Sequence, residues 1–167
     1  RFKYPLFYVI ILLEVINMKL LLHTCCAPCS VYCVESLQKE NIDITSFWYN
    51  PNIHPYKEYE MRLETLKAYD EKIGIPLIRD DYYGLKEFCK NVIDKIDKRC
   101  GYCYLCRLEK AAIYAKEHGY DGFSTTLLIS PYQDHELLKK TGEMLEKKYS
   151  IKFLYRDFRP GFREGQQ

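Results

Sequence analysis

The chain has 167 residues, of which 47% are hydrophobic, 29% charged and 15% aromatic. A chain of this length is typical of one domain, and such a domain buries roughly 68–70% of its unfolded surface, so a stable core needs no disulfide cross-links. With 7 prolines and 8 glycines the composition excludes low-complexity disorder, and a net charge of +2 is too small to indicate nucleic-acid binding by composition.

Residues 1–17 precede the first predicted strand and contain an unbroken apolar run at residues 6–13. The run resembles the core of a signal peptide, but it is far shorter than the ~20 residues that span a bilayer, and no small-residue cleavage site follows it. We therefore expect residues 1–17 to be an extension upstream of a natural start at Met18, with a retained hydrophobic N-terminal element as the alternative. The domain at residues 18–167 is then expected in the cytoplasm, with no membrane association.

From Met18 onwards, apolar or β-branched runs alternate with segments of helical spacing. In chain order these patterns predict a strand at 18–23, a helix at 30–37, a strand at 44–49, a helix at 55–72 ended by Gly74, a strand at 76–79, a helix at 84–93, a polar loop at 94–99, a helix at 105–118 capped by Gly119, a strand at 123–128, a helix at 134–149 and a strand at 151–155. Such alternation is typical of a single α/β domain with a doubly wound, mostly parallel sheet. Ligands collect at the carboxyl ends of such strands.

Six of the eight cysteines fall in two short clusters, about seventy residues apart. These are Cys25-Cys26-x-x-Cys29 and Cys100-x-x-Cys103-x-x-Cys106. Disulfide frameworks spread their cysteines to join distant loops, whereas two short clusters are typical of ligands that close on one metal centre. The spacing therefore favours a metal centre in a reducing compartment over structural disulfides.

Cys25, Cys26, Cys100 and Cys103 form the predicted four-thiolate shell. Adjacent cysteines point to opposite faces of an extended strand but converge in a turn that enters a helix, and the positive end of a helix dipole stabilises thiolates. Four thiolates suit tetrahedral zinc as well as an iron–sulfur cluster, so the residues leave both metals open. The ligand-binding edge of a sheet is a poor place for a purely structural ion, which slightly favours iron–sulfur.

The remaining cysteines are expected to have other roles. Cys33 and Cys89 are predicted to be small core residues, because free cysteine is among the most buried residue types. Cys106 is predicted to face the core, with a place at the metal site as the alternative. Cys29 is a candidate ligand of a second metal ion or a thiol that supports the other ligands.

Several stretches of the sequence match a known family. They are residues 23–30 (HTCCAPCS), 49–55 (YNPNIHP) with Glu58, Tyr59 and Arg62, 99–108 (RCGYCYLCRL), 125–133 (TTLLISPYQ) and 157–165 (DFRPGFREG). Together these motifs closely resemble the cobalamin-independent epoxyqueuosine reductases of the QueH type, from Met18 to the last residue. The resemblance implies a two-electron reduction of epoxyqueuosine to queuosine in the anticodon loop of tRNA, the final step of queuosine biosynthesis.

The resemblance also implies the cofactors and the fold. Members of this family hold a 4Fe-4S cluster on cysteines that match Cys25, Cys26, Cys100 and Cys103, with an additional iron beside it. Their fold is related to the adenine nucleotide alpha hydrolases, a Rossmann-like (HUP) class. An electron donor is implied, and its identity stays open. Family members continue into a tail with a Cys-Gly-Cys redox pair, so we expect this chain to be a C-terminally truncated member that lacks the pair.

Asp157 and Cys29 are the candidate catalytic residues, as ligands of the additional iron, which would act as a Lewis acid on the epoxide oxygen. A helix cap or a partner of an arginine is the alternative for Asp157. His54 is a candidate contact to the substrate, with stabilisation of its loop as the alternative. His23 is a candidate acid near neutral pH, or a hydrogen-bonded residue at the end of a strand.

Charged and aromatic side chains alternate near the C-terminus, a pattern that suits phosphate contact and base stacking. Arg159 and Arg163 are the candidate contacts to tRNA in this segment, with a solvated arginine-rich terminus as the alternative. Tyr132 and Gln133 are candidates to face the modified base, with a plain chain turn as the alternative.

Two other functions remain as alternatives from the sequence. One is a nucleotide-dependent tRNA-modifying transferase on a similar sheet, although cysteines occupy the loop where a glycine-rich phosphate cradle would be expected. The other is a non-catalytic zinc-binding RNA module. Colour after anaerobic purification separates them, because an iron–sulfur protein is brown and a zinc protein is colourless.

Overall fold

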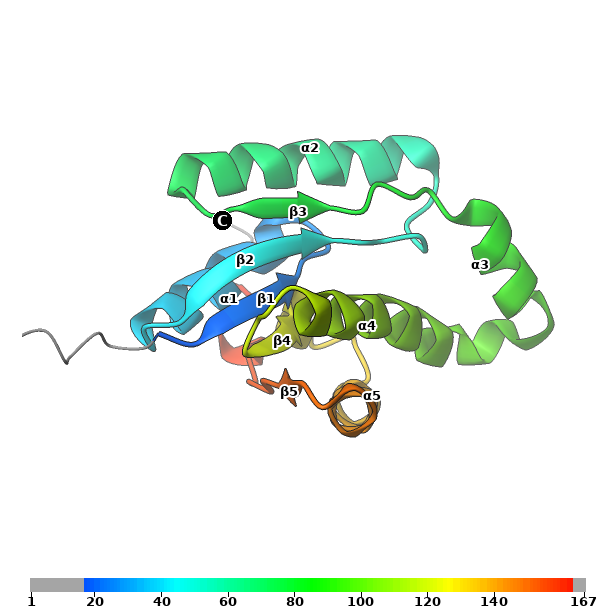
Figure 1. Cartoon of the computed structure of the whole chain (residues 1–167). Coiled ribbons are helices and arrows are strands. Elements are labelled where there is room, and N and C mark those ends of the chain that lie inside the picture. Colours follow the sequence, from blue (N-terminus) through cyan, green and yellow to red (C-terminus); the bar gives the residue numbers. More distant parts are fainter. Residues whose placement is uncertain (1–16, 164–167) are drawn as a thin grey trace, which may run out of the picture.

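A computed structural model describes residues 17–163 of the chain (Figure 1). Its elements, in chain order, are β1 (Lys19–His23), α1 (Ala27–Lys39), β2 (Asp43–Trp48), α2 (Tyr56–Ile73), β3 (Leu77–Arg79), α3 (Leu85–Val92), the 3-10 helix η3 (Ile93–Lys98), α4 (Arg99–Glu117), β4 (Gly122–Thr125), the 3-10 helix η4 (Thr126–Ile129), α5 (His135–Tyr149), β5 (Lys152–Phe153) and the 3-10 helix η5 (Arg159–Gly161). This alternation confirms the predicted α/β class. The expectations for the N-terminal apolar run and for the C-terminal end fall outside the described residues.

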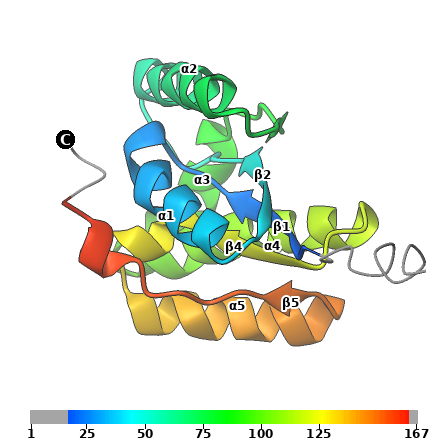
Figure 2. The same ribbon diagram turned by 90° about the vertical axis from the view of Figure 1, so that its left-hand side faces the viewer.

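The five strands form one parallel sheet with the order β3-β2-β1-β4-β5. Helices α1 and α2 cover one face of this sheet, and α4, which packs against α5, covers the other (Figures 1 and 2). The sheet is therefore doubly wound, as predicted. Because the strand order reverses between β1 and β4, the crevice beyond their carboxyl ends is the place where ligands bind in such sheets.

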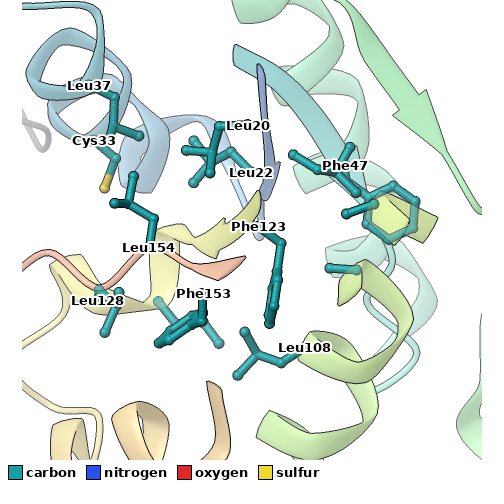
Figure 3. Close-up of a cluster of buried hydrophobic side chains, with 14 of the residues drawn as sticks. Leu20, Leu22, Cys33, Leu37, Phe47, Leu108, Phe123, Leu128, Phe153 and Leu154 are labelled. Carbon is teal, nitrogen blue, oxygen red and sulfur yellow. The ribbon is translucent and has the colours of Figure 1, made fainter. Parts of the chain in front are cut away.

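The core consists of apolar side chains that alternate between the two faces of the central strands (Figure 3). Leu20 and Leu22 of β1 point towards Leu37 of α1, whereas Phe123 of β4 points towards Leu108 of α4. All five side chains are fully buried. A strand covered on both faces is apolar at consecutive positions, which explains the Leu20–Leu22 run, and each such side chain contributes about 1.5–3 kcal/mol through its burial.

A smaller cluster holds α2 against the edge of the sheet. Trp48 at the end of β2 packs against Tyr59 of α2, and its indole Nε1 donates a hydrogen bond to the Tyr59 hydroxyl at 3.0 Å. Tyr59 in turn donates to Asp81 at 2.7 Å. At Gly84, an added Cβ would lie 2.5 Å from Cβ of Pro51, so the chain before α3 packs directly on the loop after β2. These contacts fix the loop between β2 and α2.

Two predicted boundaries differ from the structure. The predicted polar loop at residues 94–99 is largely the 3-10 helix η3, and the helix predicted at 105–118 begins at Arg99, so the second cysteine cluster lies inside α4. The strand predicted at 123–128 ends at Thr125, whose hydroxyl accepts a hydrogen bond from the Leu127 N–H at 3.2 Å and starts η4. A short apolar run does not distinguish a buried strand from a buried helical turn.

The two cysteines predicted for the core have different environments. Cys33 is fully buried on the inner face of α1, as predicted. Cys89 is exposed, so its prediction is wrong. The reason is that α3 lies at the periphery and buries only Val92 among its eight residues, so most of its surface faces solvent.

Candidate metal centre

A cavity of about 670 Å³ opens at the carboxyl ends of β1 and β4. Its wall is formed by the first turns of α1 and α4, the loop between β2 and α2, and the segment from η4 to α5. The predicted site residues in this wall are Cys25, Cys29, His54, Cys100, Cys103, Tyr132 and Gln133. The structure thus brings two cysteines from each cluster to one cavity at the predicted edge of the sheet, whereas Cys26, a predicted ligand, is not part of the cavity wall.

The first cluster occupies the tight turn between β1 and α1. One residue separates Cys25 from the end of β1. Cys26 has an extended backbone and immediately precedes α1, which has Pro28 in its first turn. This turn brings together the sulfurs of Cys25, Cys26 and Cys29, which all lie within 4.8 Å of one another, with Cys25 and Cys26 3.9 Å apart. Thr126 of η4 lies behind them, with its hydroxyl 3.6 Å from the Cys25 sulfur.

Hydrogen bonds among the three thiols shift their pKa values. Hydrogen bonds from Cys26 and then Cys29 hold the pKa of Cys25 well below its usual range, although burial opposes this shift. The same hydrogen bonds to Cys25 raise the pKa of Cys26, to about 12, and that of Cys29. One thiolate, on Cys25, is therefore stabilised by its two neighbours at a helix N-terminus, and a metal ion can take the place of their protons.

The second cluster lies in the first turns of α4. Cys103 is buried and Cys100 is exposed, and both line the cavity together with Cys25 and Cys29. Burial raises the pKa of the Cys103 thiol. Neither Cys100 nor Cys103 belongs to the group of sulfurs that lie within 4.8 Å of one another.

The donor set fits a thiolate-bound metal centre. Thiolates are soft ligands that select zinc, copper(I) and iron–sulfur clusters, and four-thiolate shells hold both zinc and 4Fe-4S. Tetrahedral zinc with Zn–S bonds of about 2.3 Å requires sulfurs roughly 3.8 Å apart. In a cluster each cysteine binds a different iron, so the ligand sulfurs stand further apart. The close group of Cys25, Cys26 and Cys29 fits one metal ion, and Cys100 and Cys103 line the same cavity as Cys25 and Cys29.

Arg107 supports an anionic centre at this place. It lies one turn after Cys103 on α4, is 5% exposed and lines the cavity. Its Nε donates to the Cys103 carbonyl oxygen at 3.0 Å. Burial lowers the pKa of Arg107, while the thiols of Cys25 and Cys103 counteract this shift. A buried guanidinium next to thiols favours their thiolate form, which is the form that binds a metal.

His23 holds the ends of three strands together beneath the cysteine turn. Its Nε2 lies 3.2 Å from Asn50 Oδ1, an acceptor, so Nε2 carries the proton and Nδ1 accepts from the Thr125 hydroxyl at 2.9 Å. Asn50 donates its amide to the Thr24 carbonyl oxygen at 2.9 Å. Burial, followed by the positive charge of Arg107, lowers the pKa of His23 to about 4. His23 is therefore a neutral, hydrogen-bonded residue at the strand end, the second of its two predicted roles.

Three further predicted site residues, His54, Gln133 and Tyr132, line the cavity or its rim. His54 packs against Tyr83 and Phe88, with ring centroids 5.0 and 5.1 Å away. Gln133 Oε1 accepts a hydrogen bond from the Tyr104 hydroxyl at 2.7 Å, and Tyr132 is 85% exposed at the rim.

Asp157 and Arg159 do not line the cavity. They form an ion pair, in which Arg159 Nε lies 2.7 Å from Asp157 Oδ1. Arg159 lowers the pKa of Asp157 to about 2. Arg163 lies at the end of the described residues and is exposed. The pairing with an arginine is the alternative that the sequence left open for Asp157.

Cys106, for which a core position was predicted, lies in a second and smaller hollow of about 330 Å³. It is half-buried and hydrogen-bonded to the phenols of Tyr49 and Tyr102. Burial raises the pKa of the Cys106 thiol, and these two hydrogen bonds offset part of that shift. Arg107, Thr126 and Asn52 line the main cavity and were not predicted as site residues. Arg107 could have been found from its position four residues after Cys103 in the helix that carries the second cluster.

Between residues 17 and 163, no helix combines the length and the apolar character needed to cross a bilayer.

Comparison with known proteins places the chain in a family. A family model described as epoxyqueuosine reductase QueH matches residues 20–167. A protein of Dehalococcoides mccartyi with that name is 39% identical over 148 residues, covering 89% of this chain and 81% of the relative. The proteins of the same name from Haemophilus influenzae and Thermotoga maritima are 41% and 33% identical over 78% and 87% of this chain. The chain spans 55% of the former relative and 78% of the latter. It belongs to the epoxyqueuosine reductase QueH family.

Proposed function

We propose that this chain reduces epoxyqueuosine to queuosine in the anticodon loop of tRNA in the cytoplasm, with a 4Fe-4S cluster on Cys25, Cys26, Cys100 and Cys103. The main support is the convergence of both cysteine clusters on one cavity, in a chain that belongs to the QueH family. The cavity volume of about 670 Å³ lies within the range of pockets that enclose one small-molecule group.

The reaction sets the demands on the site. Conversion of an epoxide to an alkene breaks both carbon–oxygen bonds, forms the carbon–carbon double bond and releases the oxygen as water, with uptake of two electrons and two protons. When bound, the metal centre supplies electrons and Lewis acidity to this reaction. The protein holds the ligand thiolates at two helix N-termini and encloses the modified base, and an electron donor outside the chain supplies the electrons.

Five residues are proposed to contact the modified base, a flanking base and the phosphates. His54 and Gln133 line the cavity, and the hydrogen bond from Tyr104 orients the Gln133 amide. Tyr132 presents an exposed ring at the rim, 5.8 Å from the ring of Phe162, on which a flanking base can stack. Arg159 and Arg163 are proposed to contact the phosphates.

The additional iron is proposed to bind Cys29, with Asp157 as a further ligand. The closeness of the Cys29 sulfur to those of Cys25 and Cys26 supports a role in metal binding. A role for Asp157 requires its ion pair with Arg159 to open. Asp157→Ala is expected to reduce the iron content below that of the wild type without loss of acid-labile sulfide, and undiminished iron would remove Asp157 from the proposal.

The proposed cluster is tested by counting iron and acid-labile sulfide per chain after anaerobic purification. The wild type is expected to be brown, with about four irons and four sulfides in its cluster. Single Cys→Ser substitutions at positions 25, 26, 100 and 103 are expected to lose most of both, because a hydroxyl is a poor ligand for this cluster. Cys89→Ser is the matched control, since Cys89 is exposed and outside the cavity, and it should retain both.

A zinc-binding RNA module is the second candidate, favoured by one observation. The 3.9 Å separation of the Cys25 and Cys26 sulfurs is close to the spacing in a single tetrahedral zinc site. A colourless protein that holds one zinc per chain, loses it on Cys29→Ser substitution and leaves epoxyqueuosine unchanged would replace the reductase proposal with this one.

A further inference from the structure

The Arg107 guanidinium carries a positive charge in the cavity wall, and no carboxylate of the described residues is paired with it. The side chain is 5% exposed, and within residues 17–163 no carboxylate oxygen forms a salt bridge with it. Its one hydrogen bond in that part of the chain runs from Nε to the carbonyl oxygen of Cys103. The two terminal nitrogens of the guanidinium have no protein acceptor there, although Arg107 lines the cavity.

The other charged groups in the cavity wall already have partners. Glu58 is paired with Arg62, with 2.6 Å between Oε1 and Nε. Arg99 donates from Nη1 to the Ile96 carbonyl oxygen at 3.2 Å. A protein carboxylate therefore does not explain why the Arg107 charge is buried.

The acidic groups that act most strongly on the Arg107 guanidinium are the thiols of Cys25 and Cys103, which come from the two clusters. Burial of an unpaired ion costs several kcal/mol, and this cost is offset only by a nearby opposite charge. Thiols are uncharged while they hold their protons, but they become anions when they bind a metal. A metal-bound thiolate shell would therefore place the missing opposite charge beside Arg107.

We propose that the Arg107 guanidinium is the fixed counter-charge of the thiolate metal centre and that it raises the reduction potential of this centre. The inference rests on the proposed function, because it requires a redox-active centre on Cys25 and Cys103. Reduction adds one negative charge to the centre, and a positive charge held in a poorly solvated wall stabilises the reduced state more than the oxidised state.

The test compares the reduction potential of the reconstituted wild type with those of Arg107→Gln and Arg107→Lys. Each is titrated anaerobically with dithionite and redox dyes and followed by visible absorbance, and iron, sulfide and melting temperature are measured on the same samples. Arg107→Gln is expected to lower the equilibrium constant for one-electron reduction at least tenfold, which corresponds to a potential about 59 mV more negative. Arg107→Lys keeps the charge and should stay within threefold of the wild type.

Lys116→Gln is the matched control, because Lys116 lies on α4, as Arg107 does, but near the far end of that helix and outside the cavity wall. Its potential should equal that of the wild type. An unchanged potential in Arg107→Gln, with iron and sulfide intact, overturns the inference while the proposed function stands. The same holds if Arg107→Gln raises KM for tRNA at an unchanged potential, since the guanidinium then binds a substrate anion.

Two further outcomes concern proteins that lose the centre. If folded Arg107→Gln holds no iron and Arg107→Lys holds the full amount, the positive charge is required by the centre, which supports the inference. If both folded variants lose iron, the geometry of the guanidinium and not its charge is required, which overturns it. A wild type without a redox-active centre would overturn the proposed function, and this inference with it.

Discussion

Asp70 is a carboxyl group buried away from the metal site. It lies on α2 with 1% of its surface exposed, and neither carboxyl oxygen has a hydrogen-bond partner within the described residues. Burial raises the pKa of Asp70 from its ordinary value of 3.8 to about 6, and the hydroxyl of Ser46 on β2 offsets this shift in part. At neutral pH the fold therefore buries an ionised carboxylate that the unfolded chain would leave in water.

The sign of the resulting pH dependence follows from the raised pKa. The folded state holds the Asp70 proton up to about pH 6, whereas the unfolded chain releases it near pH 4. This residue therefore lowers the free energy of unfolding as the pH rises from 4 to 6, by up to ~3 kcal/mol. Asp70→Asn is expected to match the wild type near pH 4 and to exceed its stability at pH 7, as measured by urea unfolding of the metal-free protein.

Asp157→Asn serves as the control with the opposite sign. Because Arg159 lowers the pKa of Asp157, the ionised form is stabilised in the fold, and its contribution is present above about pH 4 and lost as the pH falls towards 2. Asp157→Asn should therefore not gain stability at pH 7. If Asp70→Asn were less stable than the wild type at pH 7, the carboxylate of Asp70 would have a partner that the structure lacks.

The positions and contacts of single residues show which parts of the site can be predicted from the sequence. The positions of Cys25 and Cys26 after the first strand follow from the apolar run before them. The partner of His23, however, is Thr125, which lies 102 residues away and becomes a neighbour only through the pairing of β1 with β4. Residue type and spacing predict which side chains reach the edge of the sheet, but not which buried groups they contact there.

Among the elements, α5 packs closely on β5, because Gly142 lacks a side chain. An added Cβ at this position would lie 2.2 Å from Cε1 of Phe153 in β5, and Phe153 is itself buried. Gly142→Ala is expected to destabilise the fold by about 1–3 kcal/mol through overpacking, despite the higher helix propensity of alanine. Thermal or urea unfolding of the metal-free protein measures this change.

Gly101→Ala is the matched helical control. Gly101 lies on α4, and an added Cβ there meets no atom within 4 Å. The substitution should therefore be neutral or stabilise the fold by up to ~1 kcal/mol, as helix propensity dictates. Equal effects of the two substitutions would show that α5 can move away from β5 at little cost.

The elements themselves were predicted well where the apolar pattern is long, and less well where it is short. Gly74 ends α2 in the left-handed conformation, with φ of 72°, as its position after the amphipathic segment predicts. Residues 94–99 were predicted as a loop, yet residues 93–98 form η3, which buries no side chain and leads directly into α4. Its helical turns follow from local backbone bonding, which the apolar pattern does not report.

For the molecule as a whole, the proposed metal centre would connect the first turns of α1 and α4. A ligand that binds only the folded state increases the free energy of unfolding. Reconstituted protein should therefore unfold at a higher urea concentration than metal-free protein, with a free energy of unfolding that is larger by at least ~3 kcal/mol. The Cys100→Ser, Cys103→Ser double variant should lose this increment and match the wild type in the metal-free state. A double variant that keeps the increment would show that these two cysteines do not bind the metal.

The proposed binding of tRNA would involve the surface around the cavity. Each phosphate contact that is lost lowers the salt dependence of the affinity by about one counterion. The double variant Arg159→Ala, Arg163→Ala is expected to reduce the slope of log affinity against log salt concentration by roughly 1–2, as measured by filter binding to tRNA at several salt concentrations. Lys152→Ala, Lys116→Ala is the control, since β5 and the end of α4 lie away from the cavity. An unchanged slope in the arginine variant would place both arginines outside the phosphate contacts.

At this scale the sequence predicts the parallel sheet and the edge at which the cysteines meet, because alternating elements and strand ends are local features. The charge balance of the cavity was not predictable in the same way. The position of Arg107 four residues after Cys103 relates it to the second cluster, but only the structure shows that Cys25, from the turn after β1, shares its cavity.

The pairing of β1 with β4 has a consequence for synthesis. The turn with Cys25 leaves the ribosome early, but β4, which completes its surroundings with Thr125 and Thr126, follows a hundred residues later. The nascent chain therefore exposes its first cysteines for several seconds, at translation rates of about 5–20 residues per second, before the sheet that shelters them closes. If the proposed centre forms here, its loading must wait until β4 has been synthesised and has paired with β1.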